Sequence, residues 1–300
     1  GIARFRLAPF RCRRRQMGVQ HLHLPRLAVE LEEHRAVALV VELADRVEDR
    51  GRLVTDYKTG AAPSAGQIGR GLGRQRIAYA DRELYIGDAD FVEVPVEGLV
   101  DRTYMASRSA LIDPAKALTE AEPGIPPGAP LARADGDEPP EHGTSHFSVV
   151  DGAGNAVSYT STIEGAFGSG LFFGGFFLNN ELTDFSSTPE IGGNPVANRV
   201  EGGKRPRSSM APTIVFDNAG DIVLVIGAAG GPTIPVQVAR SIIGVLDFGM
   251  SAEDALALPL LMSFGSVAIT EEGSAVADMV EELQALGHGT IRVVSPSGKA

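Results

Sequence analysis

Cysteine, tryptophan and long hydrophobic runs are what this sequence has least of. One cysteine, Cys12, occurs among 300 residues, which excludes an intramolecular disulfide framework and a zinc or iron–sulfur site built from several cysteines. No apolar stretch approaches the length that crosses a bilayer, so we expect no membrane span. Positive charge is also scarce: 27 Lys and Arg against 38 Asp and Glu leave a formal net charge of −11. That balance argues against nucleic-acid binding by the chain as a whole.

Glycine, in contrast, is abundant, and the rest of the composition is that of a globular protein. Hydrophobic residues make up 43% and charged residues 22% of the chain, enough to bury a core in one large domain or two smaller ones. The 36 glycines predict many tight turns. The basic run at residues 13–15 is not followed by an apolar stretch, so no secretory signal is visible and the compartment stays open.

Local patterns predict different structures in the two halves of the chain. In the first half we expect strands at 37–43 and 53–57, a linker at 60–73, a helix at 102–112 and a mobile, proline-rich loop at 123–140. The second half predicts two hairpins and then three helices. The first hairpin pairs strands 146–150 and 156–162, and the second pairs strands 213–216 and 222–226. The first helix is expected at 236–248, the second begins after Ser251 and ends near Pro259, and the third is expected at 275–286.

Thr144 stands where the proline-rich loop meets the first of these hairpins. A threonine hydroxyl is a poor nucleophile unless a base lies beside it, and its own amino group can serve once the preceding peptide bond is broken. Gly143, directly before it, would let the chain bend and expose the carbonyl that must be attacked. The competing interpretation is that Thr144 simply begins a strand, as threonine often does.

Several motifs in a fixed order favour the first interpretation, because together they resemble the small subunit of γ-glutamyltransferases. They are Gly143-Thr144-Ser145-His146-Phe147-Ser148-Val149-Val150-Asp151, Phe167-Gly168-Ser169-Gly170, Leu178-Asn179-Asn180-Glu181-Leu182-Thr183-Asp184-Phe185, Lys204-Arg205-Pro206-Arg207-Ser208-Ser209-Met210 and Gly230-Gly231. The segment Ala78-Tyr79-Ala80-Asp81-Arg82 is similar to the end of the large subunit of that family. The resemblance covers about residues 76–300.

The resemblance implies an α+β, four-layer αββα fold of the N-terminal-nucleophile hydrolases, incomplete in this chain. The precursor would cut itself between Gly143 and Thr144, giving a large and a small subunit. Thr144 would then attack a γ-glutamyl amide such as glutathione, with its own amine as base and Thr162 as a hydrogen-bonding support. The glutamyl group would pass to water, an amino acid or a peptide. Gly230 and Gly231 would stabilise the oxyanion through their backbone N–H groups. No metal and no cofactor are implied.

Five further residues match positions that hold the substrate in that family. Glu181 and Asp184 would bind its α-amino group, and Ser208 and Ser209 its α-carboxylate. The fifth, Glu164, stands where well-known members carry asparagine. An ionised carboxylate there only accepts hydrogen bonds and would repel the carboxylate of a substrate, which leaves room for a related acylase specificity like that of cephalosporin acylases. Most of the large subunit, including the arginine that clamps the α-carboxylate, has no match here, so a catalytically silent fragment is a further alternative.

A different resemblance is visible upstream of the γ-glutamyltransferase match. Asp45, Asp56 and Lys58 resemble the core of PD-(D/E)xK nucleases, in which carboxylates hold a divalent metal. Gln75 and Tyr79 have the spacing of a further motif of those nucleases. A metal-dependent nuclease fragment is therefore the weakest alternative. We expect a foreign segment at 1–75, the end of a large subunit at 76–143 and a truncated catalytic domain at 144–300.

Overall fold

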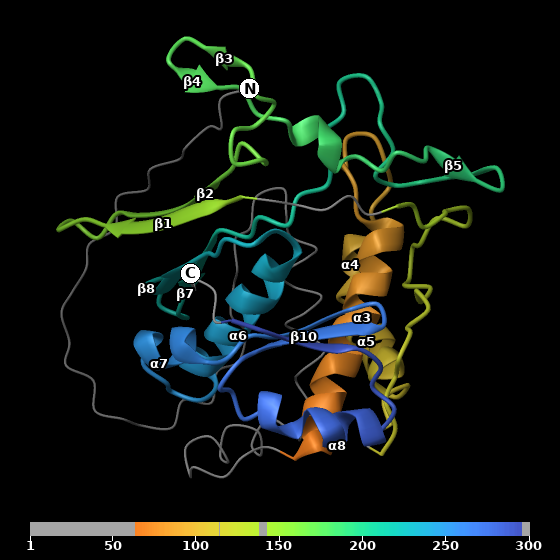
Figure 1. The fold of residues 1–300 in the computed structure, drawn as a ribbon. Coiled ribbons are helices and arrows are strands. Elements are labelled where there is room, and N and C mark those ends of the chain that lie inside the picture. The colour runs from red at the N-terminus through yellow and green to blue at the C-terminus, as the bar shows by residue number, and fades with distance from the viewer. Residues whose placement is uncertain (1–63, 114, 138–142, 296–300) are drawn as a thin grey trace.

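The computed structural model describes residues 64–113, 115–137 and 143–295 (Figure 1). The strands expected at 37–43 and 53–57 lie outside these residues, and so do Asp45, Asp56 and Lys58 of the nuclease hypothesis. None of the helices in the described ranges is long and apolar enough to cross a membrane.

The first described element is a long helix, α3 (Ala65–Tyr85), which corrects the expected linker at 60–73. Ser64 and Gln67 form a capping box: the Ser64 N–H donates to Gln67 Oε1 at 2.7 Å, and the Gln67 N–H donates to Ser64 Oγ. Each glycine costs this helix about 1 kcal/mol relative to alanine. The cap and the burial of Ile68 and Leu72 offset that cost. The helix also runs without a break across residues 75 and 76, where we had placed a domain boundary.

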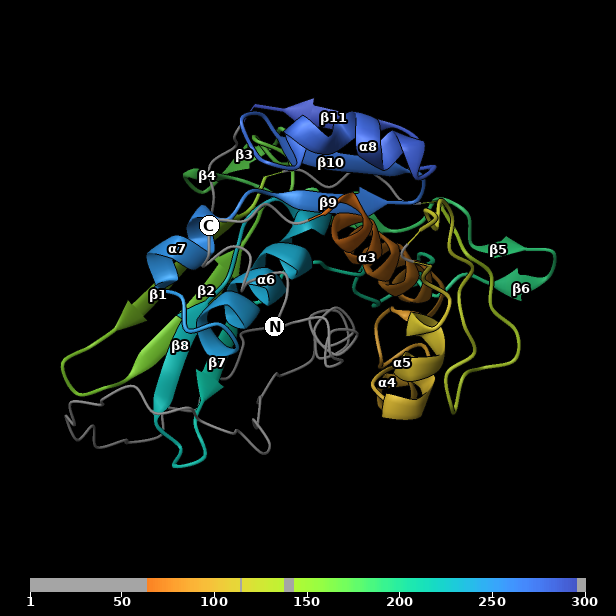
Figure 2. The same cartoon turned by 90° about the horizontal axis from the view of Figure 1, so that it is seen from below.

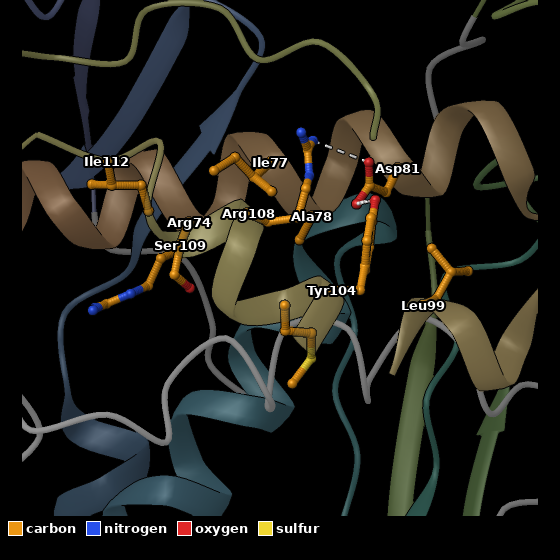
Figure 3. Close-up of a pocket in the computed structure, with 10 residues that line it drawn as sticks. Arg74, Ile77, Ala78, Asp81, Leu99, Tyr104, Arg108, Ser109 and Ile112 are labelled. Carbon is orange, nitrogen blue, oxygen red and sulfur yellow. Dashed lines mark hydrogen bonds and ion pairs between the residues drawn. The ribbon is translucent and has the colours of Figure 1, made fainter. Parts of the chain in front are cut away.

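Two short helices, α4 (Val96–Leu99) and α5 (Arg102–Ser109), follow and pack on the second half of α3. The helix expected at 102–112 is confirmed but ends three residues earlier. Figure 3 shows a shallow pocket between α3 and α5, at whose edge Asp81 holds the two together. Tyr104 Oη donates to Asp81 Oδ2 at 2.7 Å, and Arg108 Nη2 lies 3.1 Å from Asp81 Oδ1. The described part of the loop at 123–140 has no helix or strand, as predicted.

Both predicted hairpins are present. Strands β1 (Ser145–Val150) and β2 (Ala156–Ser161) pair antiparallel, with Ser145 opposite Ser161. Strands β7 (Thr213–Phe216) and β8 (Ile222–Ile226) pair in the same way, with Thr213 opposite Ile226. The polar face of the first hairpin lies on β8, because Ser158 Oγ donates to the carbonyl oxygen of Ile226 at 2.9 Å. Its other face carries Phe147, which is 52% exposed.

Short elements that the sequence did not predict connect the two hairpins. They are β3 (Phe172–Phe173), β4 (Phe176–Phe177), the 3₁₀ turn η1 (Glu181–Asp184), β5 (Glu190–Ile191) and β6 (Asn194–Pro195). The two small hairpins β3–β4 and β5–β6 project from the body of the molecule as arms (Figures 1 and 2). Strands of two residues are too short to show the alternation of apolar and polar residues by which a strand is recognised in a sequence.

The C-terminal part covers the second hairpin and then packs on α3. After the 3₁₀ turn η2 (Gly231–Thr233), helix α6 (Ile234–Leu246) packs Val238 and Ile242 against Val215 and Ile226 of β7–β8. The remaining elements are α7 (Ala252–Ala257), β9 (Leu261–Phe264), β10 (Val267–Glu271), η3 (Ala277–Met279), α8 (Val280–Ala285) and β11 (Ile291–Val294). The sheet has the order β11–β10–β9, and α3 lies along β9 (Figure 2).

The three helices predicted in this part all occur, with different bounds. Ser251 caps α7 as expected, since its Oγ accepts the Asp254 N–H at 3.0 Å. The helix expected at 275–286 is shorter, because residues 277–279 form a 3₁₀ turn before α8 begins. Gly287 ends it with a φ of 97°, a conformation that favours glycine.

Two glycines of α3 provide a matched test of this packing. A Cβ at Gly71 would meet nothing within 4 Å, so Gly71→Ala should raise the free energy of unfolding by about 0.5–1 kcal/mol through helix propensity alone. A Cβ at Gly69 would lie 2.8 Å from Nε2 of the buried His288, so Gly69→Ala should lower it. Urea unfolding of the two variants measures the difference, and an equal gain in both would show that Gly69 is not packed against His288.

Candidate active site

The peptide bond between Gly143 and Thr144 is contacted directly by a side chain of the neighbouring strand. Thr162, just after β2, donates the hydrogen of its Oγ1 hydroxyl to the carbonyl oxygen of Gly143. The N–H of Glu164 donates to the same Oγ1 at 2.8 Å. The result is a short relay of hydrogen bonds, from Glu164 through Thr162 to the carbonyl. The support that Thr162 would give to the Thr144 amine stays a prediction.

The backbone around Glu164 is strained in a way that serves this relay. Its φ is 69°, and it is the one non-glycine residue with a positive φ among the described residues. Such a conformation costs on the order of 1–3 kcal/mol and persists only when the surroundings impose it. Glu164 is 3% exposed, and a Cβ at Gly143 would lie 2.9 Å from its carbonyl oxygen. Glycine at position 143 is therefore required for the close approach of the two segments.

The turn with Gly230 and Gly231 follows the end of β8, next to the start of β1. The end of β8 and the start of β1 approach each other at Gly227, where a Cβ would lie 2.2 Å from the ring of His146. Gly230 has a φ of 125°, and its carbonyl oxygen accepts the Thr233 hydroxyl at 2.9 Å. Glycine thus suits this turn for conformational reasons. That its N–H groups stabilise an oxyanion stays a prediction.

His146 lies close to the same turn, and its two ring nitrogens both contact hydroxyl groups of the first hairpin. Its Nδ1 is 2.8 Å from Thr160 Oγ1, and its Nε2 is 3.0 Å from Ser148 Oγ. Burial lowers the pKa of His146 below its usual value, which favours the neutral ring. A neutral imidazole with one donor and one acceptor nitrogen suits two hydroxyl partners.

Glu181 and Asp184, the predicted ligands of an α-amino group, lie on η1. Asn180, directly before η1, connects this element to the turn that contains Glu164. The Asn180 N–H donates to Ile163 O at 3.2 Å, and its Oδ1 accepts the Gly165 N–H at 2.8 Å. These bonds fix η1 against the turn that contains Glu164. The sequence analysis did not single out Asn180, although it belongs to a quoted motif.

Ser208 and Ser209 are connected to the same group by Asn198. Asn198 Nδ2 donates to Asp184 O at 2.8 Å, and its Oδ1 accepts the N–H of Arg207 at 2.8 Å. Ser209 is 2% exposed, and its Oγ accepts Nη2 of Arg82 at 2.8 Å. Contacts therefore connect the turn at Glu164 to η1, and η1 to the serine segment, and they add Asn180, Asn198 and Arg82, which the sequence analysis did not assign.

The two nuclease-motif residues that the structure describes have other partners. Gln75 Nε2 donates to Leu261 O at 3.0 Å, and its Oε1 accepts the Ser263 N–H at 2.8 Å. Tyr79 is buried and donates to the carbonyl oxygen of Pro232. Both residues thus connect α3 to the C-terminal part. Within residues 64–113, 115–137 and 143–295, no group of three or more His, Cys, Asp or Glu side chains is placed to hold a metal ion.

Comparisons with known proteins identify the family of this chain. A model of the family described as gamma-glutamyltranspeptidase matches residues 49–300, which begins upstream of the resemblance at 76. The glutathione hydrolase proenzyme of Bacillus subtilis subsp. natto is 38% identical over 224 residues, covering 71% of this chain and 36% of that protein. The glutathione hydrolase proenzyme of Pseudomonas aeruginosa is 32% identical over 283 residues, which cover 87% of this chain and 48% of that protein.

The fold has a counterpart among solved structures. The crystal structure of cephalosporin acylase from Bacillus halodurans matches with a TM-score of 0.67 over 91% of this chain and 47% of that one, at 23% identity. The likeness confirms the predicted fold class. The chain spans less than half the length of the two curated relatives. Because the family model covers most of its residues, the chain belongs to the γ-glutamyltranspeptidase family.

Proposed function

We propose that this chain cuts its own peptide bond before Thr144 and that the freed Thr144 hydrolyses γ-glutamyl amides such as glutathione. The glutamyl group passes to water, an amino acid or a peptide. The observation that carries the proposal is the hydrogen bond from Thr162 to the carbonyl oxygen of Gly143. A donor at that oxygen is what an attack on the carbonyl carbon requires, because negative charge develops there.

The proposed self-cleavage takes two balanced steps. The Thr144 hydroxyl adds to the Gly143 carbonyl carbon and its proton passes to the departing amide nitrogen, so the C–N bond breaks and an ester forms. Water then hydrolyses the ester, which leaves a carboxylate on Gly143 and a free amine on Thr144. Throughout, the Thr162 hydroxyl stabilises the charge on the oxygen, and the Glu164 N–H holds Thr162 Oγ1 in place.

The freed amine supplies the base for the second reaction. An α-amino group has a pKa near 8 in model peptides, so a usable fraction is unprotonated at neutral pH and can take the hydroxyl proton. Thr144 Oγ1 attacks the γ-carbonyl of the donor, the amine of the donor leaves with that proton, and water or an amino acid then resolves the acyl-enzyme. Gly230 and Gly231 would hold the oxyanion in this reaction.

The two fragments should stay together after the cut. Helix α3 lies before Thr144 and buries Ile68 and Leu72 against Ala268 and Leu283, which lie after it. Gln75 adds two hydrogen bonds to β9. The relatives named as proenzymes are consistent with a precursor of two subunits.

The first prediction concerns the cut itself. Purified chain should separate under denaturing conditions into fragments 1–143 and 144–300, with Thr-Ser-His as the new N-terminal sequence. Thr144→Ala should stay in one piece, because no hydroxyl is left to attack. Intact mass and Edman sequencing measure both. A wild-type chain that stays whole in folded material, as the silent-fragment alternative predicts, would contradict the proposal.

A second prediction isolates the Thr162 hydroxyl. Thr162→Val keeps the shape but removes the donor, so self-cleavage should slow by roughly a hundredfold, in line with other oxyanion donors. Thr162→Ser keeps the hydroxyl and should cut at close to the wild-type rate. The fraction of cut chain against time, followed on denaturing gels, gives both rates. Equal rates in the two variants would show that the hydrogen bond to Gly143 does not matter.

An acylase acting on a non-glutamyl acid is the second candidate, which Glu164 leaves open because well-known members of the family carry asparagine at that position. The third prediction therefore compares γ-glutamyl and glutaryl anilides, which differ only in the α-amino group. Glu164→Gln removes a negative charge and should lower the KM for the glutaryl anilide by about fivefold, roughly 1 kcal/mol, with less benefit for the zwitterionic donor. Release of the chromogenic amine measures this. Glu190→Gln, at an exposed position on β5, controls for the change in net charge, and an equal effect there would remove Glu164 from the site.

A further inference from the structure

Helix α3 contacts the candidate site at two points that lie three residues apart. Tyr79 donates its phenolic hydrogen to the carbonyl oxygen of Pro232, directly after Gly230 and Gly231. Arg82 donates from Nη2 to Oγ of Ser209 at 2.8 Å. Residues three apart lie on one face of a helix, so a single face of α3 reaches both the glycine turn and the serine pair.

The contact of Arg82 with Ser209 is buried on both sides. Arg82 is 4% exposed and Ser209 is 2% exposed. A hydrogen bond from a guanidinium group is charge-assisted and strong in such surroundings. Because Ser209 Oγ accepts from Arg82, its own hydrogen points away from Arg82, and the hydroxyl can donate as well as accept. A donor is what a carboxylate ligand needs.

The surrounding contacts hold this pair in place. Arg207, which is buried, donates from Nη1 to Glu83 O at 3.1 Å and so pulls the segment before the serines onto α3. The guanidinium carbon of Arg82 lies 5.9 Å from the centre of the Tyr79 ring, within the range of a cation–π contact. Tyr79 and Arg82 therefore support each other as well as their two targets.

We propose that Tyr79 and Arg82 are positioning residues of the candidate site. Arg82 turns the Ser209 hydroxyl toward the carboxylate of the donor and adds a positive charge behind it, while Tyr79 fixes the turn that carries Gly230 and Gly231. Both residues precede the Gly143–Thr144 bond and both targets follow it. The N-terminal fragment is thus required for the site even after the cut. This inference rests on the proposed function for its kinetic test.

The kinetic test separates the two residues by what each one holds. Arg82→Met should raise the KM for a γ-glutamyl anilide by about tenfold with little change in kcat, and should leave the KM for a 4-aminobutyryl anilide, which lacks the α-carboxylate, unchanged. Tyr79→Phe should lower kcat for both donors alike and leave both KM values in place. Arg82→Lys should recover part of the loss, because it restores a charged donor. Arg74→Met makes the same change elsewhere on α3 and should match the wild type.

A binding measurement keeps the inference testable if the chain releases no amine. Calorimetry should find L-glutamate bound by the wild type and by Arg74→Met, with about tenfold weaker binding in Arg82→Met, while binding of 4-aminobutyrate should not change. This pattern in an inactive chain would support the positioning role and count against the proposed function alone. Absence of glutamate binding by the wild type, or equal loss for both ligands in Arg82→Met, would overturn the inference, whether or not the chain is active.

Discussion

The candidate site depends on one short contact, the hydrogen bond that Thr162 gives to the carbonyl oxygen of Gly143. It joins the segment before β1 to the segment after β2, so the register of that hairpin decides whether the two groups meet. A shift by one residue would turn Thr160 of β2, and Thr162 directly after the strand, to the other face. The pairing of Ser145 with Ser161 is therefore as important to the site as any side chain in it.

The strain at Glu164 is the cost of that contact. A positive φ at a non-glycine residue is unfavourable, and here it directs an N–H group at Thr162. Structures keep such strain where the surroundings impose it, and those places are often functional. The same turn is held against η1, because the Gly165 N–H donates to Asn180 Oδ1. The strained turn therefore connects the Gly143–Thr144 bond to the segment that carries Glu181 and Asp184.

The second constraint is that the site combines two parts of the chain that a cut would separate. Helix α3 provides Tyr79 and Arg82, whereas Thr144, Ser209 and Gly230 lie beyond the cut. Burial along α3 keeps the parts together without a covalent bond, because Leu72 and Leu283 are fully enclosed. The exposed apolar face of β1–β2, with Phe147, lies on the opposite side of that hairpin from β8. This chain spans less than half the length of the two glutathione hydrolase proenzymes that it matches.

Local sequence patterns determined the hairpins, α6, the Ser251 cap and the order of the family motifs. Each of these follows from contacts between residues close in the chain, such as alternation along a strand or a side chain that bonds to a backbone group three residues later. The same reasoning failed for residues 65–73, where glycines favour a loop in isolation, but in the folded chain Gly69 lies against His288 and Leu72 is buried. Only the tertiary structure decided that Arg82 meets Ser209, because residues so far apart in the chain leave no periodic signal. Tertiary packing likewise placed the Thr162 hydroxyl on the Gly143 carbonyl, since that contact needs the pairing of two strands and a strained turn at once.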